Sequence, residues 1–136
     1  MAKVLIVEDE TLIRFSLADA LVDAGNVVVE CANVLEAVAA LGRHDDIGAV
    51  VTDVDMPGGL SGIDLVQLLK HTRPSVPVWI TSGRCLDQSN LGNAITFLAK
   101  PYDMQALARD IARHAGSRAQ AAHQSLKPRS GSASVG

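Results

Sequence analysis

Five short apolar runs, rich in Val, Ile and Leu, constrain this chain more than any other feature of its sequence. Runs of about five such residues are typical of buried strands. Four of the five end abruptly in a polar or ionisable residue, so chemistry is concentrated at strand ends. The expected strands lie at residues 3–7, 27–31, 47–52, 76–81 and 95–99.

Apolar residues at helical spacing separate these runs. Helices are expected at residues 12–24, 34–41, 61–71 and 103–115. In the third of them, the predicted apolar face consists of Leu65, Leu68 and Leu69. Residues 83–93 contain several Ser, Asn and Gly residues, which are weak helix formers, so any helix there should be short or frayed.

Cap signals mark the ends of three helices. Gly25 follows the first, Asn33 with Glu36 begins the second, Gly42 should end it, and Ser61 begins the third. Strands that alternate with helices in this way favour an α/β fold with right-handed crossovers. We expect a doubly wound, five-stranded parallel sheet of strand order 2-1-3-4-5, the flavodoxin-like (βα)5 arrangement, with helices on both faces.

Length and composition fit a single domain. The chain has 136 residues, of which 48% are hydrophobic and only 3% aromatic, which suits thin strands under helices better than an aromatic-rich sandwich or an RNA-stacking surface. Residues 117–136 are rich in Ser, Ala and Gly and have no periodic apolar face. We therefore expect a domain at residues 1–116 and a disordered tail at 117–136.

The distribution of charge argues against two classes of partner. All 15 acidic residues lie at or before Asp110, and the part of the chain before the tail has nine basic side chains, so its net charge is -6. Such a surface repels phosphate backbones, which argues against direct nucleic-acid binding. No apolar stretch of about 18 residues exists for a membrane span, and Glu8 interrupts the first run before a signal-peptide core forms. The expected location is the cytoplasm.

The polar strand ends predict the functional site. They are Glu8 and Asp9 after the first run, Asp53 after the third, Thr81 at the end of the fourth and Lys100 after the fifth. In the expected strand order, the first and third strands flank the switch point of the sheet, where ligands bind. Three carboxylates placed there repel one another, and a hard divalent cation such as Mg²⁺ relieves that repulsion. A carboxylate nucleophile, a metal, an ammonium and a hydroxyl together suit phosphoryl transfer.

Four motifs in register resemble the receiver domain of bacterial two-component response regulators. They are VEDE at 7–10, TDVDMPG at 52–58, ITSG at 80–83 and FLAKP at 97–101. The resemblance covers residues 3 to about 115. It implies a phosphoprotein of a two-component phosphorelay, a signalling protein rather than an enzyme.

The resemblance also implies a role for each motif residue. Asp53 accepts the phosphoryl group, while Glu8, Asp9, Asp53 and the backbone carbonyl of Asp55 hold Mg²⁺. Lys100 pairs with the phosphoryl oxygens, Thr81 and Phe97 act as switch residues, and Pro101 follows a cis peptide bond. The implied phosphodonor is a histidine kinase or histidine phosphotransferase. A stand-alone receiver would then signal to a downstream protein through its fourth helix, fifth strand and fifth helix, around Phe97, Tyr102 and Met104.

The chain departs from the family pattern in two places near Asp53. The loop MPGGLSGIDL is one residue longer than the common form, which should shift only the start of the following helix. Gly83, at a position that tunes phosphoryl lifetime in the family, offers no side chain to shield the site. We expect a phosphoryl group that is lost in minutes rather than days.

Two alternatives compete with a phosphorylated receiver. One is a receiver-like interaction module that never carries phosphate, although such modules normally lack the acceptor Asp or the Lys. The other is a phosphatase of the haloacid-dehalogenase type, because DVD at 53–55 resembles its acidic pair. The later region offers only scattered acids for the second motif of such an enzyme, and its N-terminal acid pair would be unexplained. Thr81 as a plain strand residue and Phe97 as plain core are the structural alternatives for the switch pair.

Overall fold

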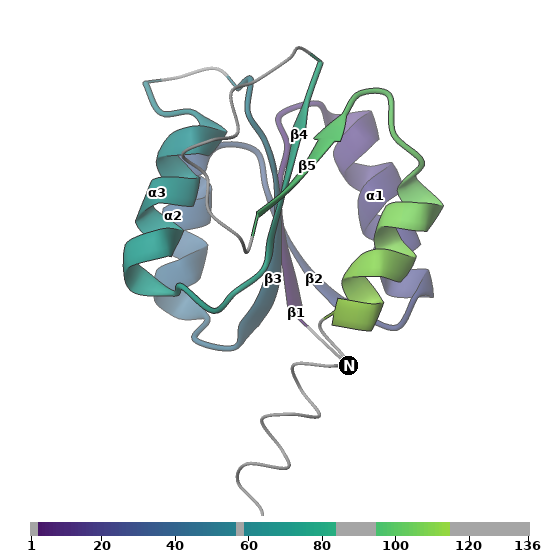
Figure 1. The fold of residues 1–136 in the computed structure, drawn as a ribbon, viewed down its shortest axis with the longest axis horizontal. Helices are drawn as coiled ribbons and strands as arrows, with labels where there is room; N and C mark the ends of the chain where they lie inside the picture. Colours follow the sequence, from purple (N-terminus) through teal and green to yellow (C-terminus); the bar gives the residue numbers. More distant parts are fainter. Residues whose placement is uncertain (1–2, 57–58, 84–94, 115–136) are drawn as a thin grey trace, which may run out of the picture.

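The five expected strands form one parallel sheet (Figure 1). The computed structural model describes residues 3–56, 59–83 and 95–114. The strands are β1 (Lys3–Val7), β2 (Val27–Cys31), β3 (Ile47–Asp53), β4 (Val78–Ser82) and β5 (Ile95–Ala99). Their order is β2-β1-β3-β4-β5, and every neighbouring pair is parallel. The predicted fold class is confirmed.

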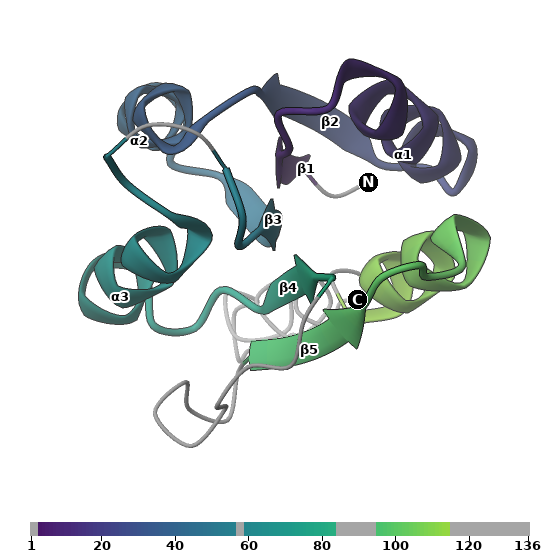
Figure 2. The same ribbon diagram turned by 90° about the horizontal axis from the view of Figure 1, so that it is seen from above.

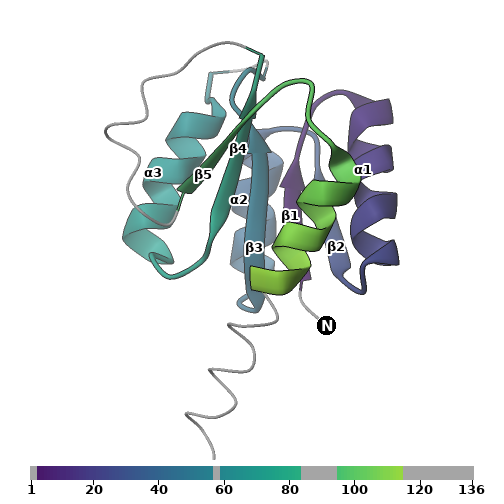
Figure 3. The same ribbon diagram turned by 45° about the vertical axis from the view of Figure 1, so that its right-hand side comes forward.

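Helices cover both faces of the sheet. They are α1 (Thr11–Asp23), α2 (Val34–Arg43), α3 (Gly62–Thr72) and a further helix whose described part is residues 104–114. Figure 2 shows α2 and α3 on one face, with α1 and the helix of residues 104–114 on the other. The latter two lie side by side in Figure 3. Two expectations lie outside the described residues and stay predictions. They are the weak helix, of which residues 84–93 are not described, and the tail of residues 117–136.

Local capping explains where the helices begin. The Asn33 side chain accepts a hydrogen bond from the Glu36 N–H at 2.8 Å, and Ser61 forms a capping box with Asp64. Gly25 follows α1 with φ of +96°, a left-handed conformation that favours glycine. The predicted stop of α2 at Gly42 is wrong. A glycine near a helix end costs only about 1 kcal/mol, and the hydrogen bond from the His44 N–H to the Ala40 carbonyl continues the helical ladder through Arg43.

Three strand boundaries and one helix face differ from expectation. The fourth strand begins at Val78 rather than at residue 76, after Pro77, whose nitrogen has no hydrogen to donate to a ladder. The third and fourth strands each extend one residue further, to Asp53 and Ser82. Leu68 is 37% exposed, because it lies about 100° around the helix from Leu69, which faces the sheet. The buried apolar residues of α3 are Leu65, Val66 and Leu69.

The sheet separates two hydrophobic clusters. Alternation along β1 sends Leu5 and Val7 to the α2 and α3 side and Val4 and Ile6 to the α1 side. All four are at most 1% exposed. Because helices cover both faces of the sheet, a ligand can approach the strands only at their ends. The polar groups described above lie at the carboxyl ends. Among the described residues, no helix has the length and apolar character needed to cross a bilayer.

Candidate functional site

The first strand delivers two carboxylates to the upper edge of the sheet. Glu8 and Asp9 follow β1 directly and precede α1. The Glu8 N–H donates to the Cys31 carbonyl at 3.0 Å, and the Glu8 carbonyl accepts from Arg14 at 2.9 Å. The Glu8 residue is only 3% exposed, whereas Asp9 is partly exposed. The backbone of the loop is therefore fixed where the two acids leave it.

The neighbouring strand contributes the third carboxylate. Asp53 is the last residue of β3, beside β1, since Thr52 pairs with Val7. It is 3% exposed, and its Oδ1 accepts a hydrogen bond from the Asp55 N–H at 3.1 Å. Burial at the end of an apolar strand distinguishes Asp53 from an ordinary loop acid.

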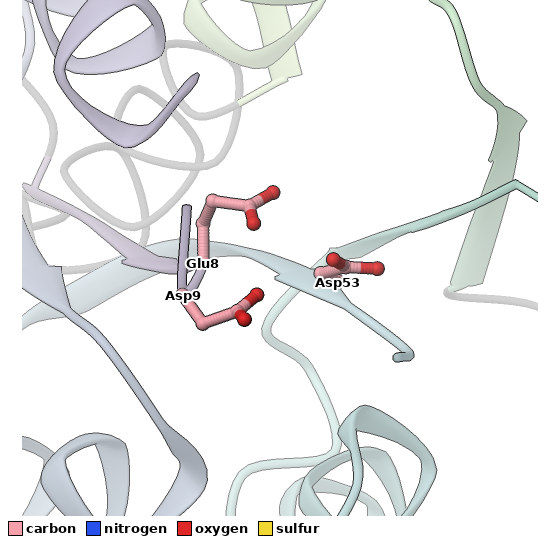
Figure 4. A group of neighbouring side chains, drawn as sticks. All are labelled: Glu8, Asp9 and Asp53. Atoms are coloured by element: carbon pink, nitrogen blue, oxygen red, sulfur yellow. The ribbon is translucent and has the colours of Figure 1, made fainter. Parts of the chain in front are cut away.

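The three acids form one cluster, shown in Figure 4. The Glu8 and Asp9 side chains project from the end of β1 toward Asp53 on β3, and one carboxylate oxygen from each of the three residues lies within 4.8 Å of the others. Ligand oxygens around one Mg²⁺ stand roughly 3–4 Å apart, because each is about 2.1 Å from the ion. The cluster therefore fits a hard divalent cation after small side-chain adjustments.

Lys100 supplies the positive charge of the site. Its ammonium donates to Asp53 Oδ2 at 2.9 Å and lies 3.7 Å from Glu8 Oε1. The Lys100 N–H donates to the Ser82 carbonyl at 2.8 Å, which continues the pairing of β5 with β4. The peptide bond between Lys100 and Pro101 is cis.

Burial and like charge shape the electrostatics of this site. Burial raises the pKa of Glu8 to about 6, and the neighbouring Asp53 charge acts in the same direction. Partial burial alone would lower the pKa of Lys100, but its hydrogen bond to Asp53 and the charges of Asp53 and Glu8 raise the pKa above its ordinary value. The ammonium thus stays charged, while the crowded carboxylates favour a bound cation.

The two expected switch residues lie on adjacent strands. Thr81 on β4 is 1% exposed and pairs in register with Asp53, so a neighbouring strand places it beside the buried acid. Phe97 on β5 pairs with Ile80 and is partly buried against the cluster on the α2 and α3 side. Tyr102 and Met104 pack partly buried against the opposite cluster.

Glycine 62 is a site residue that sequence reasoning missed. It is the first residue of α3, and a Cβ at this position would collide with the backbone carbonyl oxygen of Asp53. The Gly62 N–H also donates to the Val54 carbonyl at 3.3 Å. The signal in the sequence was the glycine directly after the Ser61 cap. The lengthened loop therefore ends in a close approach to Asp53.

Comparison with known proteins agrees with this geometry. The model of the response regulator receiver domain matches residues 4–112. The response regulator FleR of Pseudomonas aeruginosa is 34% identical over 119 residues, which are 84% of this chain and 24% of FleR. The glycerol metabolism activator of Pseudomonas putida is 32% identical over 99 residues, 71% of this chain and 44% of that protein. The chain thus spans about a quarter to a half of the length of these relatives.

Solved structures share the fold over nearly their whole length. A receiver domain from Clostridium thermocellum has a TM-score of 0.78 at 29% identity and covers 90% of this chain and 99% of its own. A chemotaxis protein of Vibrio cholerae has a TM-score of 0.73 at 26% identity, with coverage of 84% and 98%. The chain therefore belongs to the response regulator receiver domain family, whose members are signalling modules rather than enzymes.

Proposed function

We propose that this receiver accepts a phosphoryl group on Asp53 from a histidine kinase or histidine phosphotransferase, in a reaction that depends on Mg²⁺. The observation that carries the proposal is the Asp53 carboxylate, buried between two other carboxylates and an ammonium 2.9 Å away. Receiver domains bind Mg²⁺, and membership of the family implies a histidine kinase as partner.

The reaction follows from the placement of charge. A carboxylate oxygen of Asp53 forms a bond to phosphorus while the bond from phosphorus to the donor imidazole nitrogen breaks, and that nitrogen keeps the electron pair. Lys100 then faces a phosphoryl oxygen and neutralises part of its charge. Glu8, Asp9 and the Asp55 carbonyl would hold Mg²⁺ together with Asp53, and the cation supplies charge neutralisation at the phosphoryl oxygens.

The output follows from the strands beside the acceptor. Thr81 lies in register with Asp53, so its hydroxyl is the nearest switch candidate, and Phe97 lies on the next strand. We infer that phosphorylation moves Thr81 toward the phosphoryl group and Phe97 inward. The surface around Phe97, Tyr102 and Met104 would then bind a downstream protein differently in the two states.

The family assignment removes one of the two alternatives to a phosphorylated receiver and leaves the other. Membership of the receiver family excludes the phosphatase alternative. A module that never carries phosphate remains the competitor, and the hydrogen bond from Lys100 to the buried Asp53 carboxylate favours phosphorylation over it.

Labelling with acetyl phosphate tests the proposal. The wild type, Asp53→Asn and Asp19→Asn are each incubated with the donor, with Mg²⁺ or with EDTA, and the modified residue is located by mass spectrometry. Asp19 is an exposed acid on α1 and serves as the control. Wild type and Asp19→Asn should both be labelled at Asp53 when Mg²⁺ is present, and neither should be labelled in EDTA. Labelling that persists in Asp53→Asn, or labelling of the wild type that is the same in EDTA as in Mg²⁺, contradicts the proposal.

A further inference from the structure

Arg14 is fixed against the loop that carries two of the three clustered acids. One terminal nitrogen of its guanidinium donates to the Glu8 carbonyl at 2.9 Å. The Glu8 N–H is held by the Cys31 carbonyl at 3.0 Å, so both peptide groups flanking this acid are tied down. Arg14 belongs to the first turns of α1, where its own N–H donates to the Glu10 carbonyl at 2.9 Å.

The guanidinium itself has a determined orientation. Its Nε lies 3.3 Å from Glu30 Oε1 on β2, and the group stands over the Phe15 ring, 5.4 Å from the ring centre. The Arg14 side chain is only 15% exposed. A planar guanidinium has donors in a rigid fork, so two simultaneous partners determine both its place and its tilt. Arg14 thereby joins α1, β2 and the loop after β1.

The loop needs such a tether because of the charge that it carries. Glu8 and Asp9 lie within 4.8 Å of Asp53, and three carboxylates at that separation repel one another. Only Glu8, Asp9 and Glu10 connect β1 to α1, so an outward movement of this short loop would separate the acids. A hydrogen bond to the Glu8 carbonyl opposes that movement and leaves the carboxylate oxygens of the cluster free for a cation.

We propose that Arg14 is a positioning residue, which holds the Glu8 carbonyl and so keeps the Glu8 and Asp9 carboxylates within reach of the same cation as Asp53. The inference rests on the proposed function, since it concerns the Mg²⁺ site of the acceptor. Arg14 acts on the backbone of a metal ligand, and partners of metal ligands commonly change metal affinity about 10- to 100-fold when they are removed.

The test compares two arginines that both donate to backbone carbonyls. Arg14→Met removes the tether at the site and keeps an unbranched side chain. Arg73→Met is the matched control, because Arg73 donates to the His44 and Leu41 carbonyls at the opposite end of the sheet. Arg14→Lys keeps one ammonium that can reach the Glu8 carbonyl. For each protein, Mg²⁺ affinity is measured by calorimetry, and stability by urea unfolding in EDTA.

Mg²⁺ affinity should fall about tenfold in Arg14→Met, recover partly in Arg14→Lys, and stay within twofold of wild type in Arg73→Met, whatever stability Arg73→Met loses. The half-saturating Mg²⁺ for labelling of Asp53 by acetyl phosphate should rise by the same factor. The inference is overturned if folded Arg14→Met binds Mg²⁺ as tightly as wild type, or if Arg73→Met loses as much Mg²⁺ affinity as Arg14→Met. In both cases the proposed function stands, provided that the wild type binds Mg²⁺. A wild-type chain that binds no Mg²⁺ overturns both.

Discussion

The indole N–H of Trp79 donates a hydrogen bond of 2.9 Å to the Asp110 carboxylate, which ties β4 to the helix of residues 104–114. Trp79 is 1% exposed in the intact domain, so loss of the Asp110 acceptor leaves an almost fully buried donor without this partner. Arg113 also donates to Asp110, at 2.8 Å. The strand that ends in Thr81 and Ser82 is therefore coupled to a helix on the outer layer.

Loss of this acceptor should destabilise the domain. Asp110→Ala leaves a buried donor unpaired, which costs about 1–3 kcal/mol. Asp110→Asn keeps an oxygen acceptor and should lose less. Urea unfolding followed by fluorescence measures both, because Trp79 is the single tryptophan of the chain. Equal stability of Asp110→Ala and wild type would show that the bond contributes nothing in solution.

The metal-free protein should become more stable when Glu8 is neutralised. The pKa of Glu8 is raised from 4.5 to about 6, so the folded state binds its proton more tightly than the unfolded state does. The ionised side chain therefore lowers stability as pH rises from about 4.5 through 6, and the cost is constant above that range. In EDTA at pH 8, Glu8→Gln should be more stable than wild type by about 1–2 kcal/mol.

Two comparisons check this prediction. At pH 4 the stability gain of Glu8→Gln should nearly vanish, because the wild-type carboxyl is then mostly protonated in both states. Glu10→Gln, which removes an exposed acid of the same loop, should change stability little at either pH. A gain of Glu8→Gln that is independent of pH would point to packing rather than charge.

Gly62 should tolerate no side chain. In Gly62→Ala, the new Cβ meets the backbone carbonyl of Asp53, which cannot rotate away as a side chain can. Overpacking of this kind costs about 1–3 kcal/mol, and the displaced Asp53 should also be labelled more slowly by acetyl phosphate. Gly59→Ala is the matched control, since a Cβ there meets nothing within 4 Å. Similar stability and labelling of the two variants would contradict the close approach.

Gly83 should set a short lifetime for the aspartyl phosphate. A Cβ at this position meets nothing within 4 Å among the described residues, so the first atom of an added side chain has room. Gly83→Leu should slow the loss of phosphate from Asp53 several-fold by excluding water, and Gly83→Ala should slow it less. Decay is followed by mass spectrometry after removal of the donor. If the aspartyl phosphate decays at the same rate in wild type, Gly83→Ala and Gly83→Leu, the side chain at residue 83 does not shield it from water.

The strand pattern predicted the fold and the meeting of three carboxylates at one edge for a local reason. Each apolar run is visible within five to seven residues, and the order of parallel strands brings Glu8, Asp9 and Asp53 to one edge. The contacts that were missed depend on how distant elements pack or on how a loop folds back. Nothing near Trp79 indicates Asp110, 31 residues away, and nothing in the loop after Asp53 shows that its length brings Gly62 against a carbonyl.

The prediction of the buried face of α3 was wrong for a different reason. Leu65, Val66, Leu68 and Leu69 are all apolar, so periodicity alone leaves the direction of the helix uncertain by tens of degrees. Packing chose Val66 over Leu68 because Gly62, on the same side, approaches the end of β3. Gly62 and Val66 lie about one turn apart, so the side of α3 that approaches Asp53 is also the side that buries Val66.

The ion pair between Asp53 and Lys100 spans 47 residues, and β5 enters the sheet only through β4. During synthesis on the ribosome, the Asp53 carboxylate is made long before the lysine that faces it. A nascent chain that stops short of residue 100 contains the aspartate without its counter-charge. Until residue 100 has been made, the carboxylates at the ends of β1 and β3 therefore have no ammonium from β5 to offset their repulsion.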